Sequence, residues 1–457
     1  MKSDVMTNMG IDDTLDEVNP TIGAERISAK IDRTAYLTNL VKLRSGETPD
    51  WMKTTRDQAS AIVQEMAIPS SKDENWRFTD LSELVQTEFQ SVNHPAALGF
   101  EQIKAYMLPE TTNSRLVFVD GRYAADLSSI DDLPESVFLG GLAQSHEFLP
   151  KVNEYFGKLP GGEEVFTALN TSSVIDGALV WIPKDQTVEA PIHLLMIATG
   201  TANHLIQPRV LVIAESGSKS TIVEDYVCLG DRAYFTNSVA EIHIADNASV
   251  THSRIQRDSQ SAFHIGKTVV SQARGSIYSG IAIHFGGIMS RHNWEAYSQG
   301  EQTHTEMLGL TWVDDDRLGD THSLIAFSKS HGTANQINKC IVDDKAHAIF
   351  NGRICVPKLA QHTNAAQLSR NLLLSPKARI DTKPQLEIVA DNVKCAHGAT
   401  VSQLEDDAVF YLQSRGIDAD SARKLLTYAF ATDVINHIPV PSLKARLQTQ
   451  VKSANEV

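Results

Sequence analysis

Two stretches decide the fold: Arg209-Val-Leu-Val-Ile-Ala-Glu-Ser-Gly-Ser-Lys219 and Ala240-Glu-Ile-His-Ile-Ala-Asp-Asn-Ala-Ser249. Each combines a short run of β-forming residues with a corner of small or polar residues. Further corners continue the pattern: Ala273-Arg-Gly-Ser, Gly300-Glu-Gln-Thr, His331-Gly-Thr, Pro376-Lys-Ala and His397-Gly-Ala. Most successive corners lie roughly 20–30 residues apart, which is the repeat range of solenoids. The longer interval between His331 and Pro376 predicts an extra turn near Asp344-Lys-Ala.

This repeat carries two or three strands per unit and no long helix, which favours a parallel β-helix over a sandwich built from tight hairpins. Residues before about 110 and after 400 show helical spacing instead. We therefore expect a mainly β protein with a right-handed parallel β-helix core flanked by helical ends. The expected divisions are 1–165 for a mostly helical N-terminal domain with a short strand region, 166–400 for the core and 401–457 for a C-terminal helical domain.

Composition narrows the classes of function. The formal net charge of −15 over 457 residues argues against a nucleic-acid partner, which needs a basic stripe. No apolar run approaches the roughly 20 residues of a membrane span. The first 23 residues are polar and acidic, unlike a signal or transit peptide, so we expect a cytoplasmic protein. Four cysteines without C-x-x-C spacing indicate reduced thiols.

A thiol and an imidazole stand two residues apart in Asp391-Asn-Val-Lys-Cys395-Ala-His397-Gly398. On a strand, residues i and i+2 face the same side, so Cys395 and His397 present sulfur and nitrogen to one point. These donor types suit zinc, copper(I) or iron–sulfur species. Two ligands do not close a tetrahedral site, so the pair predicts a metal site completed by a second surface.

Other motifs are weaker. Gly266-Lys267-Thr268 has the tail of a phosphate-binding loop, but Ser261 stands where the first glycine belongs and the following residues favour a strand, so we expect no ATPase activity from this chain.

Thirteen of the sixteen histidines lie between residues 193 and 397, which leaves a stand-alone histidine-rich metal-binding solenoid as an alternative. The candidates for such a site are His304, His322, His331, Cys340 and Cys355.

A second alternative is a carbohydrate-active β-helix enzyme, which needs paired carboxylates. Asp314-Asp-Asp316 and Asp343-Asp344 offer acids, but adjacent residues of a strand point to opposite faces and pair poorly.

The run from Cys395 to Ser402, with Phe410-Tyr-Leu-Gln-Ser-Arg-Gly-Ile417 and Ala422-Arg-Lys-Leu-Leu-Thr-Tyr-Ala-Phe430, resembles the C-terminal signature of the SufB/SufD family of SUF iron–sulfur cluster assembly proteins. The segment Lys72-Asp-Glu-Asn-Trp-Arg-Phe-Thr-Asp-Leu81 is similar to the SufD branch. SufB-type chains typically carry glutamate directly after the histidine, where this chain has Gly398, and bacterial SufB chains often have an N-terminal cysteine cluster, whereas here no cysteine precedes Cys228.

The resemblance implies a non-catalytic scaffold subunit that pairs with SufB through the edge of its β-helix and contributes to nascent cluster formation and iron delivery at that interface. A transient iron–sulfur cluster would be shared with SufB through His397 and Cys395. The resemblance leaves open a reduced flavin on the assembled complex and a homodimer of the isolated chain. The SufC ATPase would dock on the C-terminal helices, with these contact residues: Leu404, Phe410, Tyr411, Arg415, Leu425, Tyr428 and Phe430.

Overall fold

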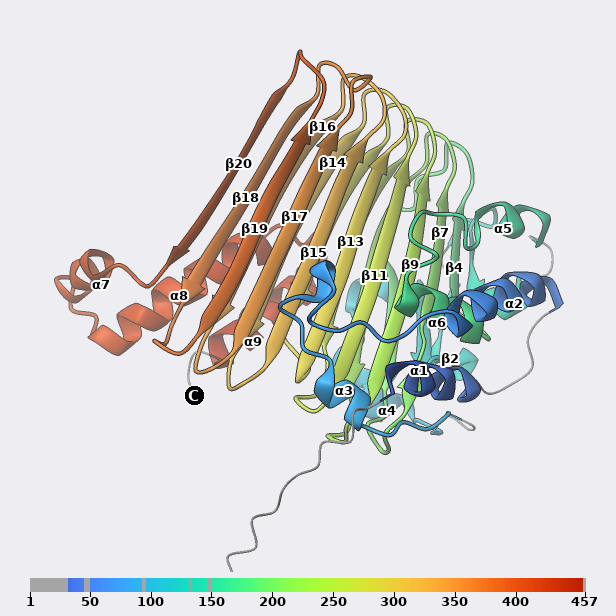
Figure 1. Ribbon diagram of the computed structural model, residues 1–457, viewed down its shortest axis with the longest axis horizontal. Helices are drawn as coiled ribbons and strands as arrows, with labels where there is room; N and C mark the ends of the chain where they lie inside the picture. Colours follow the sequence, from blue (N-terminus) through green and yellow to red (C-terminus); the bar gives the residue numbers. More distant parts are fainter. Residues whose placement is uncertain (1–31, 45–49, 93–95, 132, 146–148, 455–457) are drawn as a thin grey trace, which may run out of the picture.

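The computed structural model describes residues 32–44, 50–92, 96–131, 133–145 and 149–454. Its centre is a solenoid of two mainly parallel sheets, and from β7 to β20 the chain alternates between them from one strand to the next (Figure 1). The fold confirms the predicted parallel β-helix between helical ends. The right-handed sense of the winding stays a prediction.

The first sheet has the order β2-β1-β5-β8-β10-β12-β14-β16-β18-β20. Its strands are β1 (Arg115–Val119), β2 (Arg122–Tyr123), β5 (Ile192–Ala198), β8 (Lys219–Cys228), β10 (Ser249–Arg257), β12 (Ile277–His284), β14 (His304–Val313), β16 (Thr333–Val342), β18 (Asn364–Leu373) and β20 (Lys394–Ser402). The short β2 is antiparallel to β1, whereas the pairs from β1 to β20 are parallel.

The second sheet has the order β19-β17-β15-β13-β11-β9-β7-β4-β3, and β6 (Leu205–Ile206) pairs beside β9. Its other strands are β3 (Phe138–Gly141), β4 (Ala178–Ile182), β7 (Arg209–Ala214), β9 (Phe235–Ile244), β11 (Phe263–Gln272), β13 (Met289–Ser298), β15 (Leu318–Phe327), β17 (His347–Val356) and β19 (Arg379–Ile388). Residues paired between neighbouring turns are 26 positions apart at Phe263 and Met289 and 32 apart at His347 and Arg379.

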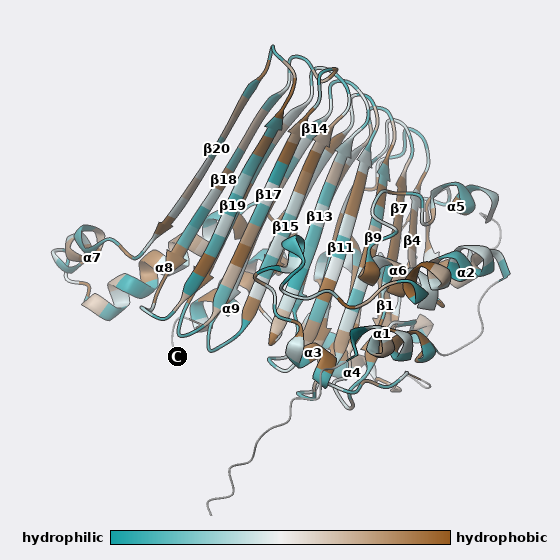
Figure 2. Ribbon diagram, viewed as in Figure 1, coloured by the Kyte–Doolittle hydropathy of each residue, from teal (hydrophilic) through white to brown (hydrophobic). Residues whose placement is uncertain are grey.

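Alternate side chains of each strand point between the sheets, where they form one apolar core along the solenoid. Figure 2 shows the resulting alternation of hydrophobic and hydrophilic residues along the strands. The outer faces are covered in part. The C-terminal helices α8 (Ala419–Ile435) and α9 (Pro441–Ala454) pack on the first sheet, and helices that precede the solenoid pack on the second.

The helices before the solenoid are short. They are α1 (Arg33–Lys42), α2 (Asp50–Gln64), α3 (Ser82–Gln86), α4 (Phe100–Ile103), α5 (Leu149–Tyr155) and α6 (Val165–Ser173). Single 3-10 turns accompany them: η1 (Glu74–Trp76), η2 (Lys104–Tyr106), η3 (Pro109–Thr111), η4 (Ala125–Leu127) and η5 (Leu142–Gln144). Asp32 caps α1 by accepting hydrogen bonds from the first-turn amides. The predicted helical spacing at Ile27 and Ile31 lies outside the described residues.

One corner of the solenoid repeats a left-handed backbone residue on successive turns. Its positions are Asn247, Gly275, Gln302, His331 and His362, with φ between 59° and 65°. The backbone amide at each of these positions donates to a carbonyl of the next turn, for example His331 N to Gln361 O at 2.9 Å. We call these five residues the corner column. These hydrogen bonds fix the register of one turn against the next, and the left-handed backbone that they need suits corners of glycine or short polar residues.

Two details of the sequence prediction are wrong. His397-Gly-Ala is not a corner, because these residues lie inside β20, and the chain turns before them at residues 389–393. The helical spacing expected after residue 400 begins later: Glu405 is the N-cap of α7 (Asp406–Gln413), and β20 extends to Ser402 because it still pairs with β18. The extra turn near Asp344 is confirmed by the corner that precedes β17.

Candidate functional site

The solenoid ends in two strands, β19 and β20, one in each sheet. Within the described part of the chain, no strand pairs with the outer edge of either. Cys395 and His397 lie on β20 opposite Ala365 and Gln367 of β18, which are buried residues facing the interior. The alternation of the strand therefore turns both candidate ligands toward the interior of the open end.

The two candidate ligands differ in environment. Cys395 is half-buried against the apolar core, and burial raises the pKa of its thiol. His397 is exposed. Since a thiol binds metal as the thiolate, a metal at Cys395 must displace its proton. Among the residues that the structure describes, no three His, Cys, Asp or Glu side chains gather in a metal-binding arrangement. The metal site at Cys395 and His397 stays a prediction.

The turn beneath β20 carries unsatisfied polar atoms. Gln367 Oε1 and Asn371 Oδ1 on β18 are buried and accept no hydrogen bond from the described residues. Their amide groups donate to Gln336 Oε1 at 2.8 Å and to Thr400 O at 2.9 Å. Buried acceptors without a donor are rare in proteins, so this end of the solenoid resembles a surface prepared for additional polar contacts.

The other candidate ligands lie apart from this pair. Cys340 is inside the solenoid, where burial raises its pKa to about 12. Cys355 lies 3.2 Å from a carboxylate oxygen of Glu387, and its pKa is raised to about 11 by burial and by that hydrogen bond. His304 Nδ1 bonds Thr333 Oγ1 at 2.8 Å.

The C-terminal helices expose an apolar surface. α7 projects from the solenoid beyond β20 (Figure 1). Phe410 and Tyr411 of α7 are 69% and 57% exposed, and Leu425 of α8 is 46% exposed. Arg415 places its guanidinium 5.3 Å from the centre of the Tyr411 ring and donates to its hydroxyl at 3.2 Å. Leu404, before α7, is half-buried.

The other two predicted docking residues face the solenoid. Tyr428 and Phe430 of α8 pack against the apolar cluster on the outer face of the first sheet. Lys339 Nζ lies 4.3 Å from the centre of the Phe430 ring, donates to the Phe430 carbonyl at 3.0 Å and pairs with Asp433 at 2.6 Å. These residues attach α8 to the solenoid, so the exposed part of the predicted docking surface is Phe410, Tyr411, Arg415 and Leu425.

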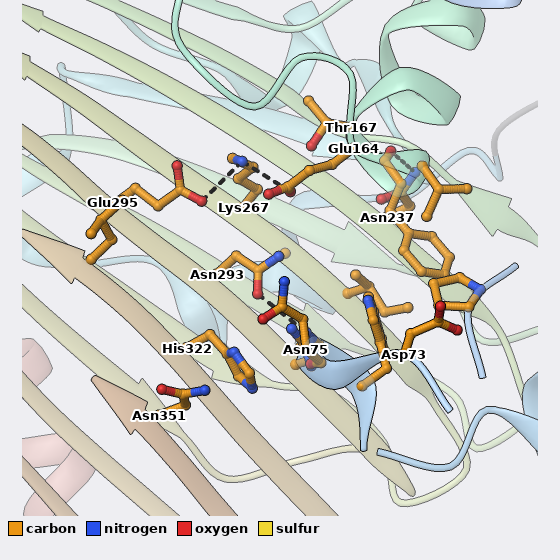
Figure 3. A pocket seen from close by; sticks show the side chains of 18 of the residues that line it. Asp73, Asn75, Glu164, Thr167, Asn237, Lys267, Asn293, Glu295, His322 and Asn351 are labelled. Atoms are coloured by element: carbon orange, nitrogen blue, oxygen red, sulfur yellow. Dashed lines mark hydrogen bonds and ion pairs between the residues drawn. The ribbon is translucent and has the colours of Figure 1, made fainter. Parts of the chain in front are cut away.

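One pocket on the solenoid was not anticipated from the sequence. It has a volume of about 770 Å³ and lies on the outer face of the second sheet, between residues 66–76 and the start of α6 (Figure 3). A row of outward-facing residues on successive turns forms its floor: Lys267, Asn293, His322 and Asn351. Lys267 Nζ pairs with Glu164 at 2.9 Å and Glu295 at 3.0 Å, so its charge is balanced within the wall.

A buried ion pair fastens one wall of this pocket. Asp320 on β15 accepts from Arg291 Nη1 at 2.7 Å and from the Thr79 hydroxyl, and it lies 3.1 Å from His322 Nε2. Burial raises the pKa of Asp320, but His322 and Arg291 together lower it to about 2. The Arg291 guanidinium also stacks 3.8 Å from the centre of the Trp76 ring. The row of outward-facing residues on the pocket floor and the Asp320–Arg291 ion pair both join residues far apart in the sequence. Residue spacing therefore did not reveal them.

Polar side chains also cross the solenoid interior. His252 bonds Glu224 at 3.1 Å and the Tyr278 hydroxyl at 3.3 Å. Nearby, His264 lies between Asp258 at 2.7 Å and Arg254 at 2.7 Å. Because Arg254 is only a donor, His264 Nε2 accepts and the proton resides on Nδ1, toward Asp258. Burial lowers the pKa of His264, so this imidazole is neutral.

No helix of the part described is long and apolar enough to cross a membrane.

The described chain is thus a two-sheet parallel solenoid with terminal strand edges that no described strand pairs and with an exposed apolar helical surface. The comparisons identify the family. The SufBD core domain of SUF system FeS cluster assembly matches residues 196–430, and the SufBD protein N-terminal region matches residues 35–194. The chain therefore belongs to the SufBD family of SUF iron–sulfur cluster assembly proteins.

Relatives of this chain support the same assignment. An iron–sulfur cluster assembly SufBD family protein of Synechocystis is 41% identical over 93% of this chain and 97% of its own length. The chloroplastic protein ABCI7 of Arabidopsis thaliana is 32% identical over 88% of this chain and 86% of its own. The iron–sulfur cluster assembly protein SufD of Escherichia coli is 31% identical over 86% and 92%. The similarity to the SufD branch seen in the sequence is confirmed.

Proposed function

We propose that this chain is a non-catalytic scaffold subunit that pairs with SufB through β19 and β20 and holds the ATPase SufC on its C-terminal helices. The observation that carries the proposal is the open end of the solenoid. Counting only the described residues, two strand edges without a strand partner, two inward-facing candidate ligands and two buried acceptors without a donor occur there together. A strand edge of this length invites a further strand, and a partner strand would cover all of these features.

The nascent cluster is the cargo of this scaffold. Cys395 offers a soft sulfur donor and His397 a borderline nitrogen donor, which fits ligation of iron. Because the described residues of this chain offer only this pair on β20, the remaining ligands would come from SufB. Delivery of iron to the interface belongs to the same proposal, and the isolated chain would use the same edge to form a homodimer.

The exposed part of the helical surface supports docking of SufC. Phe410, Tyr411 and Leu425 keep large apolar areas in contact with water on a helical hairpin that projects from the solenoid. Aromatic residues beside an arginine, here Arg415, are typical of residues that dominate protein–protein binding energy. ATP hydrolysis would then reside on SufC.

The test is co-expression with SufB and SufC, followed by size-exclusion chromatography and anaerobic absorbance. His397→Ala should keep all three subunits and lose cluster absorbance, whereas His437→Ala, an exposed histidine at the end of α8, should change neither. The same spectra record flavin, whose presence on the complex stays a prediction. A His397→Ala complex with undiminished cluster would refute the ligand assignment.

Docking of SufC is tested by point substitution. Removing everything after residue 400 would strip α8 and α9 from an apolar cluster on the solenoid, so a truncation confuses docking with folding. Phe410→Asp should release SufC while SufB stays bound. Phe100→Asp on α4, where the ring is 52% exposed, is the matched control and should retain SufC. Retention of SufC by Phe410→Asp would refute the docking surface, and failure of SufB to bind the parent chain would refute the scaffold itself.

A further inference from the structure

The last two positions of the corner column are histidines. His331 and His362 are both exposed, and their imidazole rings stack with centres 4.7 Å apart and planes inclined by 16°. Left-handed backbone favours glycine and asparagine, which occupy Gly275 and Asn247 earlier in the column. Histidine, like asparagine, is one of the residues other than glycine that adopt this backbone most readily, so the last two corners present imidazoles without unusual backbone strain.

A neighbouring amide orients one of the rings. Asn392 Nδ2 lies 3.2 Å from His362 Nδ1, and the Asn392 backbone N–H donates to Gln361 Oε1 at 3.0 Å. Amide oxygen and nitrogen exchange places by a flip. With the oxygen toward the ring, His362 Nδ1 carries the proton and Nε2 keeps a free lone pair. An imidazole whose second nitrogen donates to a carbonyl is the usual arrangement around a metal ligand.

The spacing of the rings suits one shared ion. Metal–nitrogen distances of about 2.1 Å at a tetrahedral angle put two ligating nitrogens roughly 3.4 Å apart. The ring centres lie 4.7 Å apart and the planes are inclined by only 16°, so both exposed rings must tilt for two nitrogens to reach this separation around one ion. His331 makes no hydrogen bond through its side chain among the described residues, so nothing there holds its ring away.

We propose that His331 and His362 form a binding site for a divalent first-row transition-metal ion, with Asn392 as a positioning residue and water in the remaining coordination positions. Imidazole is a good ligand for zinc, copper, nickel and iron, and the affinity order among them follows the metal. The two histidines lie on the corner that precedes β16 and β18, and Asn392 lies in the turn before β20, whereas Cys395 and His397 lie on β20 itself. The proposed site uses neither of the proposed cluster ligands.

The test measures binding of Zn²⁺ to the purified full chain by titration calorimetry. The variants are His331→Asn and His362→Asn, since asparagine adopts left-handed backbone and lacks the imidazole. The parent should bind one Zn²⁺ at this site. Each variant should lose at least about tenfold in affinity, and the double variant should lose little more than either, because one imidazole alone holds the ion weakly.

Two controls separate this site from others. His304→Asn removes an exposed histidine that is bonded to Thr333, and Cys395→Ser combined with His397→Ala removes the proposed cluster ligands. Zn²⁺ binding should survive in both, and Asn392→Ala should weaken it by about tenfold with unchanged stoichiometry. Unchanged affinity in His331→Asn and His362→Asn would overturn the proposal, as would loss of the ion only in the variant lacking Cys395 and His397.

Discussion

Replacing Asp320 by asparagine should loosen the segment that walls the pocket of Figure 3. The carboxylate is buried and holds Arg291 and Thr79, and Arg291 also donates to the Asn75 carbonyl at 2.8 Å. Asparagine keeps the shape of the side chain but leaves the buried cation of Arg291 without its counter-charge. Removing one member of a buried pair costs about 3–5 kcal/mol.

A second estimate comes from the pKa of Asp320. It is lowered from 3.8 to about 2 in the folded chain, and each unit is worth about 1.4 kcal/mol, so ionisation contributes about 2.5 kcal/mol. Because the folded pKa is depressed, this contribution is present above pH 3.8 and is lost as the pH falls toward 2. The pKa figure refers to complete unfolding, because Arg291 and His322 stay beside Asp320 on the solenoid when residues 66–86 detach. The lower end of the first figure, about 3 kcal/mol, corresponds to roughly a hundredfold change in the opening equilibrium.

Hydrogen exchange of residues 66–86 is the appropriate assay, since it reports local detachment without requiring two-state unfolding. In Asp320→Asn, the amide of Thr79, which donates to the Trp76 carbonyl at 3.0 Å, should exchange roughly a hundred times faster at pH 7. Asp316→Asn removes the same charge from an exposed position and should change exchange less than threefold. Unchanged exchange in Asp320→Asn, or equal acceleration in both variants, would refute the reasoning.

Three further predictions concern the solenoid. Burial lowers the pKa of His292 well below 6.5, so stability should fall as the pH drops below 6.5, and His292→Gln should reduce that loss by up to about 1.4 kcal/mol per pH unit in urea titrations. Lys339→Met removes the contacts to Asp433 and the Phe430 carbonyl. The free energy of opening measured by hydrogen exchange of the α8 amides should therefore fall by about 1–3 kcal/mol. Gly352→Ala would place a methyl group 2.3 Å from Gln367 Nε2, and the thermal unfolding temperature should fall with a cost of about 1–3 kcal/mol.

Each of these predictions has its own control. An acid profile of His292→Gln that matches the parent would contradict the first. If Lys339→Met accelerated hydrogen exchange of α9 as much as that of α8, relative to the parent chain, the second would be contradicted, because the lost contacts involve α8 alone. Gly162→Ala is the control for the third, since an added methyl group there meets nothing within 4 Å, and an equal loss in both glycine variants would contradict it.

The solenoid was predictable because its corners have a recognisable composition. Gly217, Asn247 and Gly275 adopt positive φ on successive turns, and residues that tolerate this backbone recur at a nearly constant interval. The same reasoning predicted a corner at His397 that the structure does not have. A histidine followed by glycine occurs at the corner at His331 and also inside β20. Pairing with β18 decides between the two, and pairing is not visible in a single stretch of sequence.

The candidate site was predictable only where its residues are neighbours in the chain. Cys395 and His397 stand two positions apart, so strand alternation alone turns them to one side. The stacked rings of His331 and His362 come from residues separated by a full turn of 31 positions. Such partners become visible only when the register of the turns is known, and that register varies from 26 to 32 residues along the solenoid.

The two ends of the solenoid are unlike, and this limits how large an assembly can grow. At the beginning, the sheets finish in the short antiparallel strands β2 and β3, which offer little edge to an incoming chain. At the far end, β19 and β20 are open along nine or ten residues. In the part of the chain that the structure describes, head-to-tail addition, which would generate filaments, therefore meets only these short edges. The pairing proposed above would join two open ends face to face, which would occupy both and close the particle at a pair.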